Sequence, residues 1–185
     1  MLITIHNPAC AIIFKSSDEI YYNIDNFIHG ILDVDLITEV RVVGYQSKDI
    51  LPKLSILPNL KKLILTRDWS DHLDNSIGLL TTLTHLSIVS CSYYYLSSNI
   101  GNLTNLVELR LPENYIKELP DTISDLTNLI KLDVSGNSLE ELNIESFRKM
   151  TSLQFVNLSR NKMYGDDKRH YIESLKEQCT VYEDD

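Results

Sequence analysis

The apolar residues of this chain recur at a fixed spacing. The segment Leu106-Val-Glu-Leu109-Arg-Leu111-Pro-Glu-Asn114 places three leucines in the pattern L-x-x-L-x-L and ends at an asparagine. Five other segments repeat this apolar pattern, and they begin at Ile37, Leu60, Leu83, Leu129 and Leu153. Successive starts lie 23 residues apart, except for a step of 24 between Leu129 and Leu153. A period of this length is typical of a solenoid, in which each repeat is one supersecondary unit.

Each unit divides into a short strand and a returning arm. Leu109 and Leu111 are separated by one residue, so both side chains face the same side of an extended strand. Asn114 follows, where its amide can hydrogen-bond the backbone at the turn. Leu119, Ile123 and Leu126 then form a second apolar row. Because one unit cannot bury both rows alone, the pattern predicts stacked units with a continuous core.

These motifs resemble the leucine-rich repeat family over residues 37–161, in six units that begin at 37, 60, 83, 106, 129 and 153. The resemblance implies an α/β fold, a leucine-rich-repeat solenoid. A curved parallel β-sheet would line its concave face, and irregular, 3-10 or helical arms its convex face. The run Leu119-Pro-Asp-Thr-Ile123-Ser-Asp-Leu126-Thr-Asn-Leu129 is similar to the 23-residue units of intracellular Ras-group scaffolds. The 24-residue unit, which contains Phe147, is similar to units of receptor-like members.

The first two units depart from this pattern. Tyr45 and Asp68 stand where the other units carry asparagine or cysteine, and Ser47 and Ser70 stand at apolar positions. We therefore expect looser arms in these two units.

The ends of the chain are predicted to cap the solenoid, whose terminal units would otherwise expose core. In the N-terminal cap, residues 1–36, the stretches 2–5 and 11–14 read as a β-hairpin and 20–32 as a helix with an apolar stripe. In the C-terminal cap, residues 162–185, we expect a helix over 166–178, a strand at 179–181 and an acidic tail.

Charge narrows the possible functions. The chain has 17 Lys and Arg against 26 Asp and Glu, a net charge of −9, which argues against nucleic-acid binding because such proteins need a basic face. No apolar run reaches the roughly 18 residues of a membrane span. The three cysteines are widely spaced and form no C-x-x-C pair, and the N-terminus lacks the features of a signal peptide. A cytoplasmic protein without membrane association is expected.

The sequence contains no pattern that indicates catalysis. We find no glycine-rich phosphate loop, and the five histidines lack metal-ligand or triad spacing, so neither a metal nor a cofactor is expected. Cys91 occupies the asparagine position and is expected to be buried and structural, with His85 on the exposed side of a strand. Adjacent acids such as Glu140 and Glu141 are better explained as solubilising loop residues. The protein is predicted not to be an enzyme.

The outward strand positions are free of core packing and can therefore bind a partner. Across the six units they hold six cations and four anions, or +2, which leaves 11 cations and 22 anions, or −11, elsewhere. Exposed aromatic residues beside arginine are typical of interface centres. The candidate partner-binding residues are Ile64, Arg67, Trp69, His85, Val89, Tyr94, Arg110, Tyr115, Lys131 and Phe155.

The function predicted from these patterns is a protein–protein interaction module, an adaptor or scaffold that binds a protein partner on the concave face as a monomer. The Ras-group resemblance raises a small GTPase as a candidate partner by analogy only. Two alternatives remain: a virus- or parasite-encoded effector that targets host proteins, and the recognition subunit of a multi-protein enzyme. The abundance of Ile, Asn and Tyr, which suggests an A+T-rich coding source, is the basis of the effector alternative.

Overall fold

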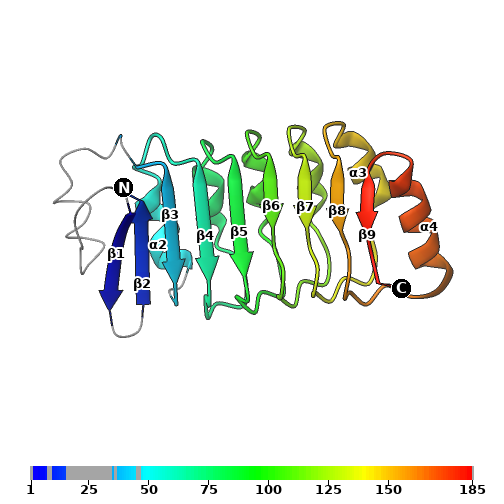
Figure 1. The fold of residues 1–185 in the computed structure, drawn as a ribbon, viewed down its shortest axis with the longest axis horizontal. Coiled ribbons are helices and arrows are strands. Elements are labelled where there is room, and N and C mark those ends of the chain that lie inside the picture. Colours follow the sequence, from blue (N-terminus) through cyan, green and yellow to red (C-terminus); the bar gives the residue numbers. More distant parts are fainter. Residues whose placement is uncertain (1, 8–9, 16–34, 36, 45–46, 185) are drawn as a thin grey trace.

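The computed structural model describes residues 2–7, 10–15, 35, 37–44 and 47–184. Within these residues the chain forms one sheet whose strands follow the order of the sequence (Figure 1). The strands are Leu2–Asn7 (β1), Cys10–Lys15 (β2), Glu39–Val43 (β3), Lys62–Thr66 (β4), His85–Val89 (β5), Glu108–Arg110 (β6), Lys131–Asp133 (β7), Phe155–Asn157 (β8) and Thr180–Tyr182 (β9).

The N-terminal strands run antiparallel and the others parallel. β1 pairs with β2 as a hairpin, and β2 pairs antiparallel with β3. The predicted hairpin is thus confirmed, whereas the helix predicted over residues 20–32 lies outside the described residues. β9 continues the sheet at the C-terminal end, where a strand was expected.

The pairing register of the parallel strands equals the sequence period. Leu63 pairs with Leu86, Leu86 with Leu109, and Leu109 with Leu132. Inward side chains of successive units therefore stack on each other, and so do outward ones. This register confirms the solenoid of stacked units predicted from the spacing.

The arms return behind the sheet as short helices (Figure 1). Three are 3-10 helices, Asn75–Leu79 (η2), Ser98–Asn102 (η3) and Asp121–Asp125 (η4). Three are α-helices, Ser47–Leu54 (α2), Ile144–Lys149 (α3) and Gly165–Lys176 (α4). α3 belongs to the 24-residue unit, and α4 is the expected C-terminal helix. We call the opposite sheet face, which these helices leave open, the concave face.

The core lies between the sheet and the arms. Leu109 of β6, Leu111 directly after it, and Ile123 and Leu126 from the arm are all buried in one continuous cluster. At the expected 25 cal/mol per Å² of buried apolar surface, each of these side chains contributes about 2 kcal/mol. The stacking of units, rather than any single arm, therefore holds the fold together.

Asparagines connect successive turns. The side-chain oxygen of Asn114 accepts the amide of Cys91 at 3.0 Å, and its nitrogen donates to the carbonyl of Leu111 at 3.0 Å. Asn137 and Asn161 likewise accept an amide of the preceding unit and donate to the carbonyl three residues earlier. These bonds satisfy backbone groups at the point where strand pairing ends.

The second unit carries Asp68 in place of the asparagine, and this residue is buried, with 4% of its surface exposed. One carboxylate oxygen accepts the amide of Ser47 at 2.8 Å and the hydroxyl of Tyr93. The other accepts the amide and hydroxyl of Ser70 at 2.8 and 2.7 Å. We expected loose arms in the first two units. In the first unit the arm is the α2 helix with Ser47 buried at its start, so the expectation was wrong there, because the serine bonds to Asp68 instead of packing as an apolar residue. In the second unit Ser70 also bonds to Asp68, and the arm contains the η2 helix.

Burial also raises the pKa of two side chains near Asp68, those of Tyr93 and Cys91, which favours their protonated forms. Burial, and then the bond to Asp68, raise the pKa of the Tyr93 hydroxyl. Burial raises the pKa of the Cys91 thiol to about 11. Cys91 is fully buried, as its repeat position predicts, and its role is structural.

No helix among the described residues is long and apolar enough to cross a membrane.

Candidate interaction surface

Two rows of outward side chains cross the concave face. The first row is Glu39, Lys62, His85, Glu108, Lys131, Phe155 and Thr180. The second row is Arg41, Ile64, Ser87, Arg110, Asp133, Asn157 and Tyr182. Since strands lie about 4.8 Å apart, each row is a line of closely spaced groups on a rigid support.

Polar side chains along the first row contact those of the neighbouring strand. The Lys62 Nζ lies 3.6 Å from the Glu39 carboxylate on β3, and the His85 Nε2 lies 4.0 Å from the Glu108 carboxylate on β6. The Lys131 ammonium lies 5.8 Å from the ring centre of Phe155, a cation–π contact.

A hollow of about 300 Å³ lies over β4 and β5 on this face. Its wall includes Arg41 at one end and Arg110 at the other, both exposed. Ile64 and Ser87 lie between them in the same row, and Ser87 leaves room because its side chain is small. Lys62, His85 and Glu108 line the hollow from the first row.

Large aromatic side chains are exposed where the strands end, a region that we call the loop edge. Trp69 is 75% exposed there, and Tyr94, Tyr95 and Tyr115 are exposed in the next two units. The rings of Tyr94 and Tyr115 stack with centroids 5.4 Å apart and planes inclined by 25°. Stacking fixes these two rings, so a partner would meet a pre-arranged apolar surface.

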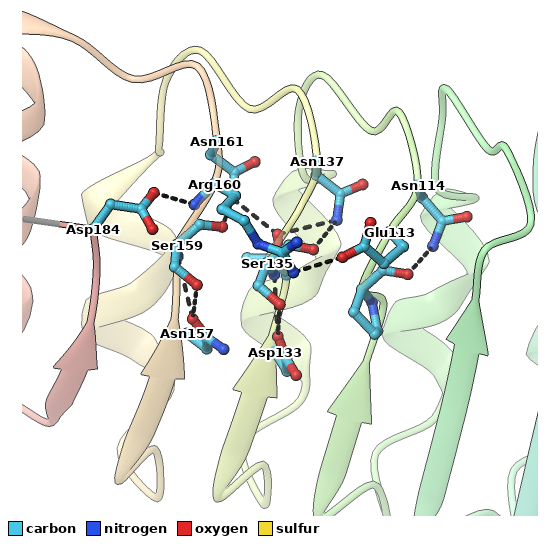
Figure 2. A network of polar contacts seen from close by, with 12 residues as sticks. Glu113, Asn114, Asp133, Ser135, Asn137, Asn157, Ser159, Arg160, Asn161 and Asp184 are labelled. Atoms are coloured by element: carbon cyan, nitrogen blue, oxygen red, sulfur yellow. Dashed lines mark hydrogen bonds and ion pairs between the residues drawn. The ribbon is translucent and has the colours of Figure 1, made fainter.

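At the C-terminal half of the face, polar side chains bond to one another (Figure 2). The Arg160 guanidinium donates to the Glu113 carboxylate at 2.5 Å across the intervening unit. Asp133 accepts the hydroxyl of Ser135 at 2.6 Å, and Asn157 accepts that of Ser159 at 2.7 Å. These groups satisfy each other and leave less hydrogen-bonding capacity for a ligand than the hollow over β4 and β5.

A glycine makes the long contact possible. The residue before each asparagine position has a left-handed backbone, with φ of 56° at Glu113, 64° at Gly136 and 55° at Arg160. A Cβ at Gly136 would lie 3.0 Å from the Glu113 carboxylate. Glycine therefore suits position 136 for two reasons. It adopts the left-handed backbone region readily, and its lack of a side chain lets Glu113 extend across it toward Arg160.

The structure divides the predicted binding residues between two adjoining regions. Strand residues on the concave face are Ile64, His85, Val89, Arg110, Lys131 and Phe155. Residues of the loop edge are Arg67, Trp69, Tyr94 and Tyr115. Ile64, His85 and Arg110 meet at the hollow, and Tyr94 meets Tyr115, but Lys131 and Phe155 lie farther along the sheet on β7 and β8.

Sequence reasoning left some residues out of this set. Arg41, Lys62 and Ser87 line the hollow, and their place in the two rows was the available signal. Glu113 and Arg160 lie 47 positions apart, one step of 23 and one of 24, so the repeat pattern places them in one row on either side of Gly136, but it does not predict that their side chains meet.

A model of the leucine-rich repeat region matches residues 39–179. The chain belongs to the leucine-rich repeat family. A leucine-rich repeat protein of Leptospira interrogans has a similar solved structure, with a TM-score of 0.74, 24% identity, and coverage of 90% of this chain and 47% of that one. TLR13, in its complex with ssRNA13, has a TM-score of 0.61, 24% identity, and coverage of 75% of this chain and 20% of that one. No curated protein sequence matches.

These similarities establish the leucine-rich repeat fold and no more. The chain spans about half the length of the Leptospira protein and a fifth of the TLR13 chain. Leucine-rich repeat folds serve in general as protein-interaction modules. Among the described residues, no group of three or more His, Cys, Asp or Glu side chains could hold a metal ion.

Proposed function

We propose that this leucine-rich repeat chain is an adaptor or scaffold that binds one protein partner on the concave face and the loop edge together. The carrying observation is the exposure of Trp69, Tyr94 and Tyr115 at the loop edge, next to the charged rows of the sheet, in which β6 ends in Arg110. Aromatic residues and arginine are the side chains that contribute most at interface centres. We further propose that the module acts in the cytoplasm, as a monomer and without catalysis.

The rigidity of the surface supports this proposal. Parallel strands hold the outward rows in register, and the Tyr94–Tyr115 stack fixes two rings before a partner arrives. Because little ordering entropy is then lost on binding, a moderate contact area can yield useful affinity. A small GTPase is one candidate by fold analogy alone. A host-directed effector and a recognition subunit would use the same surface.

Affinity capture from a lysate of the source cells, read by quantitative mass spectrometry, tests the proposal. Two variants disrupt the proposed surface. The first combines Trp69→Ala with Tyr115→Ala at the loop edge, and the second, Ser87→Tyr, fills the hollow. Tyr164→Ala is the matched control, because Tyr164 is 74% exposed, as Trp69 is, but lies at the C-terminal end of the solenoid. Thermal unfolding of each variant confirms that the fold persists.

We expect a protein that the wild type and the Tyr164 variant both enrich and that the two surface variants lose. Equal enrichment by all four chains would contradict the proposed surface. A panel of metals and nucleotides provides the check on catalysis. A clear rise in melting temperature with one of them would contradict the proposal of a purely binding module.

A further inference from the structure

We infer that the hollow over β4 and β5 recognises an extended acidic segment of the partner, in which two carboxylates are separated by three residues. The inference rests on the proposed function and specifies the chemistry of the partner. The bound segment reaches from Arg41 to Arg110 and runs perpendicular to the strands, along the second row.

Charge is the first argument. Arg41, Lys62 and Arg110 in the wall oppose the carboxylate of Glu108 in the wall and that of Glu39, which pairs with Lys62, so the two rows over β3 to β6 carry three positive charges minus two, or +1. The whole chain carries −9. An anionic ligand is therefore attracted locally even though the molecule as a whole is acidic.

The cations of the hollow remain able to bind a ligand although some have partners. Lys62 lies 3.6 Å from Glu39, and the Arg110 Nε lies 3.7 Å from Asp133, with cation side chains 43% and 51% exposed. Exposed pairs of this kind are weak. A guanidinium has five N–H donors, so Arg110 can bind a second carboxylate while Asp133 faces its Nε.

Spacing is the second argument. Arg41 on β3 and Arg110 on β6 share one row and lie three strands apart, or about 14 Å at the backbone. An extended chain advances about 3.4 Å per residue, and alternate side chains face the same way. The first and fifth residues of such a segment are therefore also about 14 Å apart on one side, which matches the two arginines.

The side chains at the centre of the second row limit which residue of the ligand can lie between its two acids. The third residue of the segment faces Ile64 and Ser87, one apolar and one small. A compact apolar side chain such as valine fits there. Beyond Arg110 the row continues with Asp133, so a further acid in the same direction would be repelled. The ligand is thus a short acid–x–apolar–x–acid segment rather than a long acidic tract.

A titration followed by amide NMR shifts tests this inference. The probe is the blocked peptide Glu-Thr-Val-Thr-Glu, and two further peptides are compared: Gln-Thr-Val-Thr-Gln without charge, and Thr-Glu-Val-Glu-Thr with the same composition but closer acids. Arg41→Gln and Arg110→Gln each remove one charge. Arg148→Gln is the matched control, because Arg148 pairs with Glu145 on the convex helix α3.

We expect Glu-Thr-Val-Thr-Glu to shift the amides of Ile64 and Ser87 most. Each of the Arg41 and Arg110 variants should raise the dissociation constant of this peptide by up to about fivefold, the upper end for one exposed ion pair, and the Arg148 variant should not. The other two peptides should bind at least about fivefold more weakly. Equal binding of Thr-Glu-Val-Glu-Thr, the absence of shifts at the hollow, or shifts centred on β7 and β8 would overturn the inference.

Inorganic phosphate and an oligouridylate are titrated as well, to test whether the hollow binds anions other than an acidic protein segment. Equal binding of inorganic phosphate or of an oligouridylate at the hollow would overturn recognition of an acidic protein segment. The proposed function is separable from this result. If Ser87→Tyr abolishes capture of the partner but Arg41→Gln and Arg110→Gln leave it unchanged, the interaction module stands and the acidic-segment inference fails.

Discussion

Replacing Asp68 with asparagine, the residue that the repeat pattern favours at this position, is expected to destabilise the protein. The Asp68 carboxylate accepts two amide hydrogens, from Ser47 and Ser70, and two hydroxyl hydrogens, from Ser70 and Tyr93. An amide side chain has one accepting oxygen and one donating nitrogen. Whichever way it is oriented, its nitrogen faces one of the two backbone N–H groups, which then has no acceptor.

The expected magnitude follows from that lost acceptor. A buried donor without a partner costs about 1–3 kcal/mol, and the remaining bonds lose their charge assistance. The neutral amide avoids the desolvation of a buried carboxylate, which acts in the opposite direction. We therefore expect Asp68→Asn to lower the free energy of unfolding by about 2 kcal/mol, equivalent to about 4–8 °C in melting temperature for a chain of this size.

Urea unfolding followed by circular dichroism measures this change, and the reverse substitution provides a control. The Asn114 nitrogen donates to the carbonyls of Ile88 and Leu111 at 3.0 Å, so a carboxylate there would face carbonyl oxygens. Asn114→Asp should destabilise by about 3 kcal/mol or more. If Asp68→Asn left the unfolding midpoint unchanged or raised it, the reasoning from the four accepted bonds would be refuted.

Three further predictions concern single residues. Gly136→Ala should lower the urea midpoint by more than Gly165→Ala, because both glycines have φ of 64° but only a Cβ at Gly136 meets Glu113, so equal effects would contradict this contact. The thiol of Cys91, whose pKa burial raises to about 11, should resist alkylation at pH 8 in the folded chain and react in denaturant; a label found on Cys91 itself by peptide mass spectrometry of the folded chain would count against its burial. Asp74→Ala should destabilise by about 1 kcal/mol at pH 7, because the Asp74 carboxylate caps η2. Hydrogen bonds from the serine two residues later lower the pKa of Asp74 below its ordinary value of 3.8. Its contribution is therefore present above that pH and declines as pH falls through the lower folded value, so a difference from wild type that did not shrink as the pH was lowered below 3.8 would oppose this assignment.

Much of the fold could be predicted because a repeat converts position in the sequence into position in space. The spacing of Leu86, Leu109 and Leu132 predicts which side chains stack, and the pairing register agrees. The same register explains why Cys91 is buried and why Arg110 is exposed on a strand. One unit contradicted the pattern, since Ser47 was expected to loosen an arm and instead bonds to Asp68.

Part of the candidate surface could not be predicted, because it depends on the reach of side chains between units. Each outward residue has a known row, but the pattern does not say which neighbour it contacts. Tyr94 could have pointed away from Tyr115, and the stack between them follows from the course of the loops. The hollow at Ser87 likewise depends on the orientations of Arg41 and Arg110 around a small side chain.

The sequence by itself determined the leucine-rich repeat architecture, the residues that form the core and the rows of outward positions. It could do so because the period of the apolar residues, 23 or 24 along the chain and two along each strand, is local and repeated. Only the tertiary structure decided the burial of the Asp68 carboxylate under Tyr93 and the reach of Arg160 over Gly136 to Glu113. These contacts join residues of different units, and their existence depends on side-chain length, backbone φ and the space that a neighbouring residue leaves.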